Sequence, residues 1–262
     1  MRRFSPKPVL ALAIAGLGAF VLPSCAENDS MMFIVGVYAR SQGACSPKAE
    51  ADSPTWANGV LDRVFANDYS AALLVGNQIT QRGSREQLRT ETSRVSLKGA
   101  EVKLETLRGE SLAEPFSSTA TGFVDAAQGT DPSLSVMYAS LIPPSVVDDL
   151  PAGTVVAKVR VFGTTLGGQD VESSELLFPI EVCDGCLVAY PASARDLTAD
   201  GTEYVCKSAT TAEDAPDADE ALPCQLGIDL PAPCTVCSGI YKICQSPRCN
   251  PSHSDPVPAD CL

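Results

Sequence analysis

The stretch Val-Val-Ala-Lys-Val-Arg-Val at positions 155–161 decides the fold. Its odd-numbered side chains are apolar, and in an extended chain they point to one side, with Lys158 and Arg160 on the other. A period of two is typical of a β-strand with one buried face and one solvated face. The stretch Glu-Val-Lys-Leu-Glu at positions 101–105 has the same period and predicts a second strand.

Further strand-like runs are spread over residues 31–190. We expect strands at residues 31–39, 69–75, 133–141 and 176–182. Residues 163–174 contain two adjacent glycines and predict a hairpin loop; they lack the Lys-Ser/Thr ending of a phosphate-binding loop. Residues 55–65 fit either a short helix or an additional strand. Short strands separated by turns predict an all-β fold, an antiparallel immunoglobulin-like or fibronectin-like β-sandwich.

The sequence changes character after this region. Residues 209–221 hold five acidic residues and no strongly hydrophobic one, and six prolines follow between positions 231 and 258. Such a segment has too little apolar material to be stabilised by burial alone. We therefore expect residues 191–262 to be a loop-rich, disulfide-linked extension of the sandwich.

The chain has 11 cysteines. If Cys25 is set aside for the reason given below, ten remain, an even number compatible with five disulfides in an oxidising compartment. Parity predicts that Cys45 pairs with a member of the distal group, but the other pairings stay open. The candidates are Cys45, Cys183, Cys186, Cys206, Cys224, Cys234, Cys237, Cys244, Cys249 and Cys261.

The N-terminus has the pattern of an export signal. Three basic residues precede an apolar stretch at positions 8–22, which is shorter than the roughly 20 residues of a membrane span. The sequence Leu22-Pro23-Ser24-Cys25 follows and resembles the lipobox of bacterial lipoproteins. The resemblance implies that residues 1–24 are a signal peptide and that Cys25 receives a diacylglyceryl thioether.

The resemblance also implies a location. Ala26 after the lipidated cysteine is similar to outer-membrane lipoproteins, so we expect attachment to the bacterial cell envelope at the outer membrane. Residues 25–30 form the lipid-attached linker, with a reach of roughly 17 Å for its five residues after Cys25. Ordinary secretion, with Cys25 discarded, and a retained signal anchor are the alternatives.

The charge balance excludes one class of partner. The formal net charge is −13, and removal of the three basic residues of the signal peptide makes it −16. Binding to nucleic acid depends on Lys and Arg neutralising phosphates, so we expect no nucleic-acid partner.

Two Cys-x-x-Cys pairs resemble metal or redox motifs. Cys183 with Cys186 and Cys234 with Cys237 could bind zinc or an iron-sulfur centre, or form a redox dithiol. Plain disulfides are favoured because the chain is expected to be exported and has six further cysteines besides Cys25. We therefore expect no metal and no cofactor.

Catalytic motifs find little support in the sequence. His253 is the only histidine and lies near the end of the chain, where we expect it to be solvated. The acidic residues at positions 214–220 lack the spacing of a calcium loop, and no carboxylate pair for a hydrolase can be chosen without geometry. Trp56 and Tyr69 fit core packing better than a glycan-binding surface.

The function we expect is therefore a non-enzymatic one. The chain is expected to be a lipid-anchored envelope protein whose sandwich contacts protein or glycan. A metal-binding or thiol redox protein is the alternative.

Overall fold

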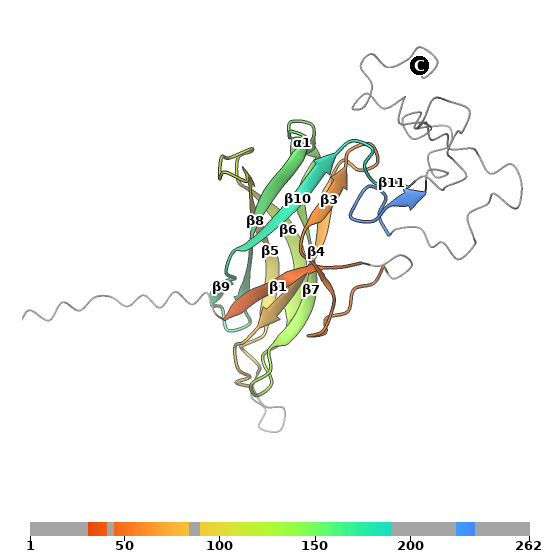
Figure 1. Ribbon diagram of the computed structural model, residues 1–262. Helices are drawn as coiled ribbons and strands as arrows, with labels where there is room; N and C mark the ends of the chain where they lie inside the picture. The colour runs from red at the N-terminus through yellow and green to blue at the C-terminus, as the bar shows by residue number, and fades with distance from the viewer. Residues whose placement is uncertain (1–30, 41–44, 84–89, 190–223, 234–262) are drawn as a thin grey trace, which may run out of the picture.

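The computed structural model describes residues 31–40, 45–83, 90–189 and 224–233. Within these ranges the chain is built of strands with one short helix, α1 (Pro144–Val147) (Figure 1). No helix in the described ranges is long and apolar enough to cross a membrane. The predicted all-β class is confirmed.

The first sheet has four strands in the order β2-β1-β4-β7 and is antiparallel throughout. Its central strand β4 is buried at every position except Ser70, which is half-buried. The sequence Ala-Ala-Leu-Leu-Val at positions 71–75 explains this, because a strand covered on both faces needs apolar side chains on both. The strands are β1 (Met32–Tyr38), β2 (Thr55–Trp56), β4 (Tyr69–Asn77) and β7 (Ser133–Ile142).

The second sheet has the order β3-β10-β8-β5-β6, and the short strand β9 also pairs with β8. Residues 155–161 lie at its centre in β8, where the four alternating apolar side chains are fully buried. The strands are β3 (Gly59–Asp62), β5 (Val95–Thr106), β6 (Phe116–Val124), β8 (Gly153–Thr165), β9 (Asp170–Glu172) and β10 (Leu176–Cys183). A separate parallel pair joins β11 (Val188–Ala189) to β12 (Ala232–Pro233).

The two sheets face each other across one hydrophobic core. Leu73 and Met137 of the first sheet belong to the same buried cluster as Val102, Val159 and Ile180 of the second. The sheets also meet at one side, where the Ser140 backbone N–H donates to the Ser118 hydroxyl of β6 at 2.8 Å.

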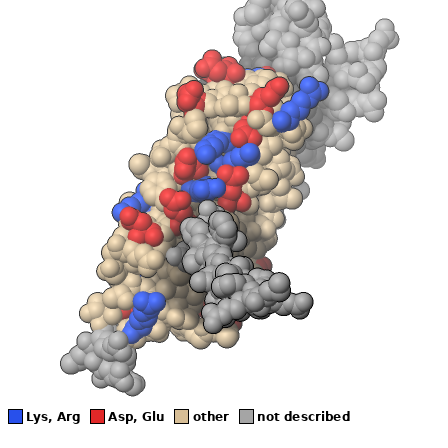
Figure 2. Space-filling view, turned by 90° about the vertical axis from the view of Figure 1, so that its left-hand side faces the viewer, with Lys and Arg blue, Asp and Glu red and all other residues tan. Residues whose placement is uncertain are grey.

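The outer face of the second sheet is charged. Lys158 pairs with Glu105 at 2.7 Å across β8 and β5, and Lys103 lies 3.7 Å from Glu101. Figure 2 shows acidic and basic side chains interspersed on one side of the molecule. This pattern is typical of a solvated sheet face.

The predicted strands are confirmed in β1, β4, β5, β7, β8 and β10. Residues 55–65 contribute the strands β2 and β3 rather than a helix, and residues 163–174 contain the turn and the short strand β9. Strand β6 was not predicted. The expectation of purely antiparallel sheets is wrong at β3, which runs parallel to β10. These two strands are far apart in sequence, so no hairpin forces them to be antiparallel.

Candidate functional site

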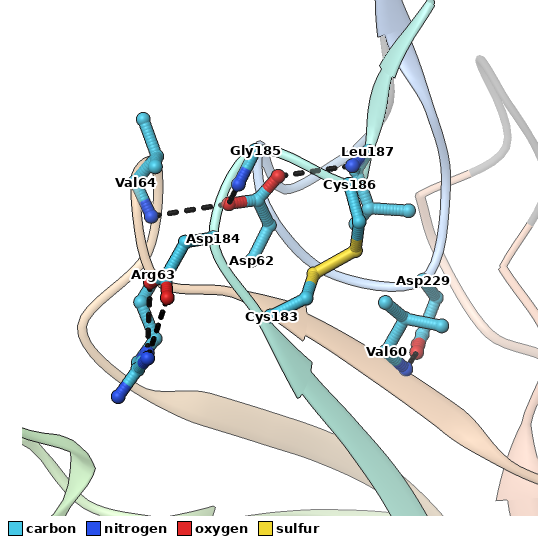
Figure 3. The surroundings of a disulfide bond; sticks show 10 residues. All are labelled: Val60, Asp62, Arg63, Val64, Cys183, Asp184, Gly185, Cys186, Leu187 and Asp229. Atoms are coloured by element: carbon cyan, nitrogen blue, oxygen red, sulfur yellow. Dashed lines mark hydrogen bonds and ion pairs between the residues drawn. A yellow bond between two sulfur atoms is a disulfide. The ribbon is translucent and has the colours of Figure 1, made fainter. Parts of the chain in front are cut away.

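Asp62 is the last residue of β3 and is fully buried. The register pairs it with Cys183, which brings its carboxylate beside the Cys183–Cys186 turn. Oδ1 accepts hydrogen bonds from the backbone N–H groups of Val64 at 3.1 Å and Gly185 at 2.7 Å (Figure 3). Oδ2 accepts one from Leu187 at 2.9 Å. Two loops are thus closed around one buried carboxylate.

Cys183 and Cys186 form a disulfide within this turn. A carboxylate oxygen of Asp62 and the two sulfur atoms all lie within 4.8 Å of one another. A negative charge at this distance disfavours ionisation of a thiol. The N–H groups of Gly185 and Leu187 donate to Asp62 and are therefore not available to stabilise a thiolate. The site therefore favours the closed disulfide over a reactive dithiol.

An ion pair holds the same turn from its other side. The guanidinium of Arg63 donates to both carboxylate oxygens of Asp184, at 2.9 and 2.6 Å, and to the carbonyl oxygen of Leu150 at 3.0 Å. This two-pronged geometry is the most specific that arginine forms with a carboxylate. It ties the turn to the loop after α1.

Asp229 is a second carboxylate that is partly shielded from solvent, and it belongs to the C-terminal segment at residues 224–233. Its Oδ1 accepts from the backbone N–H of Val60 at 3.0 Å and from the Tyr69 hydroxyl at 2.8 Å. Burial raises the pKa of Asp229, and the bonds from Val60 and Tyr69 oppose that rise. Burial, and then the nearby Asp229 charge, raise the pKa of Tyr69, so its hydroxyl stays protonated and donates.

Residues 224–233 pair with β3 and are covalently fixed. The backbone N–H of Asp62 donates to the Gly227 carbonyl at 2.9 Å, and that of Asp229 donates to the Val60 carbonyl at 3.0 Å. The Cys45–Cys224 disulfide joins residues 179 positions apart. The prediction that Cys45 pairs with a distal cysteine is confirmed.

The remaining predicted site residues divide into two groups. Tyr69 is fully buried in the core, as expected, and Trp56 is half-buried and packs against it. The other predicted residues lie outside the described ranges, so neither the lipidation site nor the second Cys-x-x-Cys pair is tested. These are Cys25, Cys206, Cys234, Cys237, Cys244, Cys249, Cys261, His253 and the acidic residues at positions 214–220.

Sequence reasoning missed the buried carboxylate of Asp62 and the half-buried carboxylate of Asp229. Asp62 and Asp229 are two of 32 acidic residues, and their partners lie far away in the chain. The only signal for Asp62 is its place at the end of an apolar run, Gly-Val-Leu, at positions 59–61. Nothing in the sequence around Asp229 distinguishes it.

No protein-family model matches this chain, and a search of curated proteins found no match. Function is therefore inferred from the residues themselves.

Proposed function

We propose that this protein is a lipid-anchored extracytoplasmic protein of the bacterial cell envelope, at the outer membrane, with a non-enzymatic structural or interaction role. Its folded part is proposed to be an immunoglobulin-like or fibronectin-like sandwich that contacts protein or glycan. The proposal rests on the Cys45–Cys224 disulfide, which joins the start of the folded region to its far end. Disulfides of this kind persist in oxidising compartments outside the cytosol.

The position of the anchor fits this role. Strand β1 begins at Met32, so six residues separate it from Cys25. Six extended residues span roughly 20 Å, which keeps the folded body close to the membrane surface. Acyl chains contribute about 0.8 kcal/mol per buried CH₂, and two or three chains give durable attachment.

The hydrogen bonds of two carboxylates support a structural role rather than catalysis. Asp62 accepts three backbone N–H groups, and Asp229 accepts one backbone N–H and the Tyr69 hydroxyl. Both carboxylates thus hold chain segments together. The metal and redox alternatives both require reduction of the Cys183–Cys186 bond. The Asp62 charge disfavours a reactive thiolate there, although the same carboxylate and the two sulfur atoms lie close enough together to hold a cation once that bond is reduced.

The anchor is tested on the full chain in its native host. We expect intact-mass analysis to find the mature N-terminus at acyl-modified Cys25 and globomycin, which blocks the lipoprotein-specific peptidase, to cause the precursor to accumulate. The Cys25→Ser variant should lose the acyl mass and leave the membrane fraction. Cys45→Ser is the matched control, because it also removes a cysteine but should keep the lipid. An unmodified mature start at Glu27 would refute the anchor.

Peptide mapping without reduction tests the role of the cysteines. We expect all ten cysteines other than Cys25 to be blocked in disulfides, with no bound metal. Four free or metal-bound thiols at Cys183, Cys186, Cys234 and Cys237 would refute the structural reading and favour the alternative.

A further inference from the structure

The fully buried carboxylate of Asp62 forms no ion pair with any Lys or Arg in the described part of the chain. The neighbouring Arg63 donates to Asp184 instead. Buried charges in proteins are usually paired with an opposite charge or coordinate a metal ion. In the oxidised protein Asp62 is compensated by backbone N–H groups alone, and a cation beside it would stabilise the carboxylate further.

Asp62 also keeps one acceptor position for a cation. A carboxylate offers about four lone-pair positions. Within the described ranges three of them accept hydrogen bonds, from Val64 and Gly185 on Oδ1 and from Leu187 on Oδ2, so one position on Oδ2 remains. Carboxylates that bind metals are commonly held in place by hydrogen bonds of this kind.

The sulfur atoms of Cys183 and Cys186 lie beside this carboxylate (Figure 3). One carboxylate oxygen of Asp62 and the two sulfur atoms lie within 4.8 Å of one another. Around a tetrahedral zinc ion, with Zn–S about 2.3 Å and Zn–O about 2.1 Å, neighbouring ligand atoms are roughly 3.6–3.8 Å apart. The three atoms can therefore reach one ion once the S–S bond is open. Cys-x-x-Cys is also the spacing with which a single turn supplies two sulfur ligands to zinc.

We propose that Asp62, Cys183 and Cys186 form a Zn²⁺ site when the Cys183–Cys186 disulfide is reduced. Two thiolates and one carboxylate suit zinc better than they suit Ca²⁺ or Mg²⁺, which prefer oxygen ligands alone. The charge of the zinc ion also offsets the repulsion between the Asp62 carboxylate and the thiolates. This inference goes beyond the proposed function, because the oxidised protein is expected to hold no metal.

The proposed site leaves one zinc position for water. Among the described residues no fourth Cys, His, Asp or Glu joins the group. Asp184 lies in the same turn, but both of its carboxylate oxygens accept from Arg63. Cys186 is exposed, so solvent can reach the ion. Three protein ligands with a water are typical of zinc sites that exchange a ligand, whereas structural zinc sites have four protein ligands.

The disulfide opens by exchange with a dithiol protein of the thioredoxin class. A thiolate of that protein attacks the sulfur of Cys186, the exposed partner, so that a mixed disulfide forms and the Cys183 thiolate leaves. The second thiol of the reductant gives its proton to solvent and attacks the mixed disulfide, which releases the Cys186 thiolate. Two electrons pass to the turn, the reductant becomes a disulfide, and both thiolates bind Zn²⁺.

Protection from alkylation by zinc tests the site on the full chain. A phosphine reductant, which competes for zinc less than a dithiol does, is added in steps. Each sample is alkylated with and without Zn²⁺ and mapped by peptide. We expect zinc to slow the alkylation of Cys183 and Cys186 roughly tenfold or more once their bond is open, because a metal-bound thiolate is a poor nucleophile. The map measures each cysteine separately, so reduction elsewhere in the chain does not affect the result.

Asp62→Asn isolates the contribution of the third ligand. It keeps an oxygen for the N–H groups of Val64 and Gly185 but removes the charge, so the zinc protection should fall roughly tenfold or more. Asp229→Asn is the matched control, because it removes a carboxylate that also accepts a backbone N–H from β3 but does not belong to this group. It should keep the protection. Alkylation without zinc shows whether the turn of each variant is still folded.

X-ray absorption at the zinc edge measures the ligands in the reduced wild type, so this part of the test does not depend on any variant. We expect sulfur and oxygen neighbours in equal number. Four sulfur neighbours, as a site shared with Cys234 and Cys237 would give, would overturn the proposal. So would equal protection in the wild type and Asp62→Asn, equal alkylation with and without zinc, or a Cys183–Cys186 bond that opens only when the protein unfolds.

The untreated protein tests the proposed function separately. Free or metal-bound thiols found there before any reductant is added would refute the structural role of the cysteines. Zinc that binds only after reduction leaves that role intact and supports the site.

Discussion

Replacing Asp62 with alanine should destabilise the protein more than any surface substitution. The carboxylate is fully buried and accepts three backbone N–H groups, those of Val64, Gly185 and Leu187. A hydrogen bond to a charged acceptor contributes about 1.5–3 kcal/mol, and an unpaired buried donor costs about 1–3 kcal/mol. Gly185 is only half-buried, so water can replace part of what is lost. We therefore expect a loss of about 3–5 kcal/mol in the free energy of unfolding.

Asp62→Asn separates the contributions of the two carboxylate oxygens. Asparagine keeps one oxygen, which can still accept from Val64 and Gly185, but its amide group would meet the Leu187 N–H donor to donor. The expected loss is about 1–3 kcal/mol, smaller than for alanine. Asp125→Ala is the matched control, because its exposed ion pair with Arg94 contributes about 1 kcal/mol at most.

Urea unfolding of the oxidised full chain measures these differences. Thiol counting on each variant confirms that the Cys183–Cys186 bond is intact, so that a change in stability is not a change in pairing. The role of Asp62 as the centre of the turn would be refuted if Asp62→Ala unfolded within 1 kcal/mol of the wild type, at the level of the surface control. A greater loss in Asp62→Asn than in Asp62→Ala would also contradict it.

Three further predictions concern the C-terminal segment. Joint replacement of Cys45 and Cys224 by serine opens a loop of 179 residues and should cost up to about 5 kcal/mol in urea unfolding, and a loss below 1 kcal/mol would contradict the loop-closure argument. Burial raises the pKa of Asp229 in the folded protein. The contribution of Asp229 to the free energy of unfolding is therefore fully present below the ordinary aspartate pKa and is lost as pH rises through the folded-state pKa. The unfolding free energy of the wild type relative to Asp229→Asn should therefore be greatest near pH 3.5 and fall toward pH 7, and a constant difference would refute the assignment. Gly227 has a φ of 80° and a new Cβ there would lie 2.9 Å from the Asp62 carbonyl oxygen, whereas Gly168 has a φ of 85° and open space. In thermal unfolding, Gly168→Ala should lower the free energy of unfolding by about 1–2 kcal/mol through backbone strain alone. Gly227→Ala should lower it by about 1–3 kcal/mol more, because the new Cβ also clashes. Equal losses would show that residues 224–233 do not pack as described.

The alternating strands could be predicted because their signal is local. In β8 the apolar and charged residues of positions 155–161 differ strongly, so the period of two is plain in the sequence. Strand β6 has the same alternation of half-buried and exposed positions, but most of its residues are Ser, Thr, Ala and Gly. Small polar residues differ little in hydrophobicity between the two faces, which hides the period. The parallel pairing of β3 with β10 could not be predicted from the sequence either, because it depends on the path of the whole chain.

The candidate site could be predicted only where parity constrains the cysteines. With Cys25 set aside, Cys45 is the one cysteine before position 183. If all ten remaining cysteines are paired, Cys45 must therefore pair with a cysteine of the distal group. The choice of Cys224 among the distal cysteines follows from the pairing of residues 224–233 with β3, which no local pattern shows. The roles of Asp62 and Asp229 could not be predicted for the same reason, because their hydrogen-bond partners lie far away in the chain.

The described part of the C-terminal extension is stabilised by burial as well as by cross-linking. The sequence predicts that disulfides replace burial there, but Ile228 lies in the main core cluster and Asp229 bonds to Tyr69. The segment also pairs with β3, one of the two edge strands of the second sheet. An edge strand exposes unpaired backbone groups that invite pairing with another chain. Residues 224–233 cover that edge, and the Cys45–Cys224 bond keeps them there.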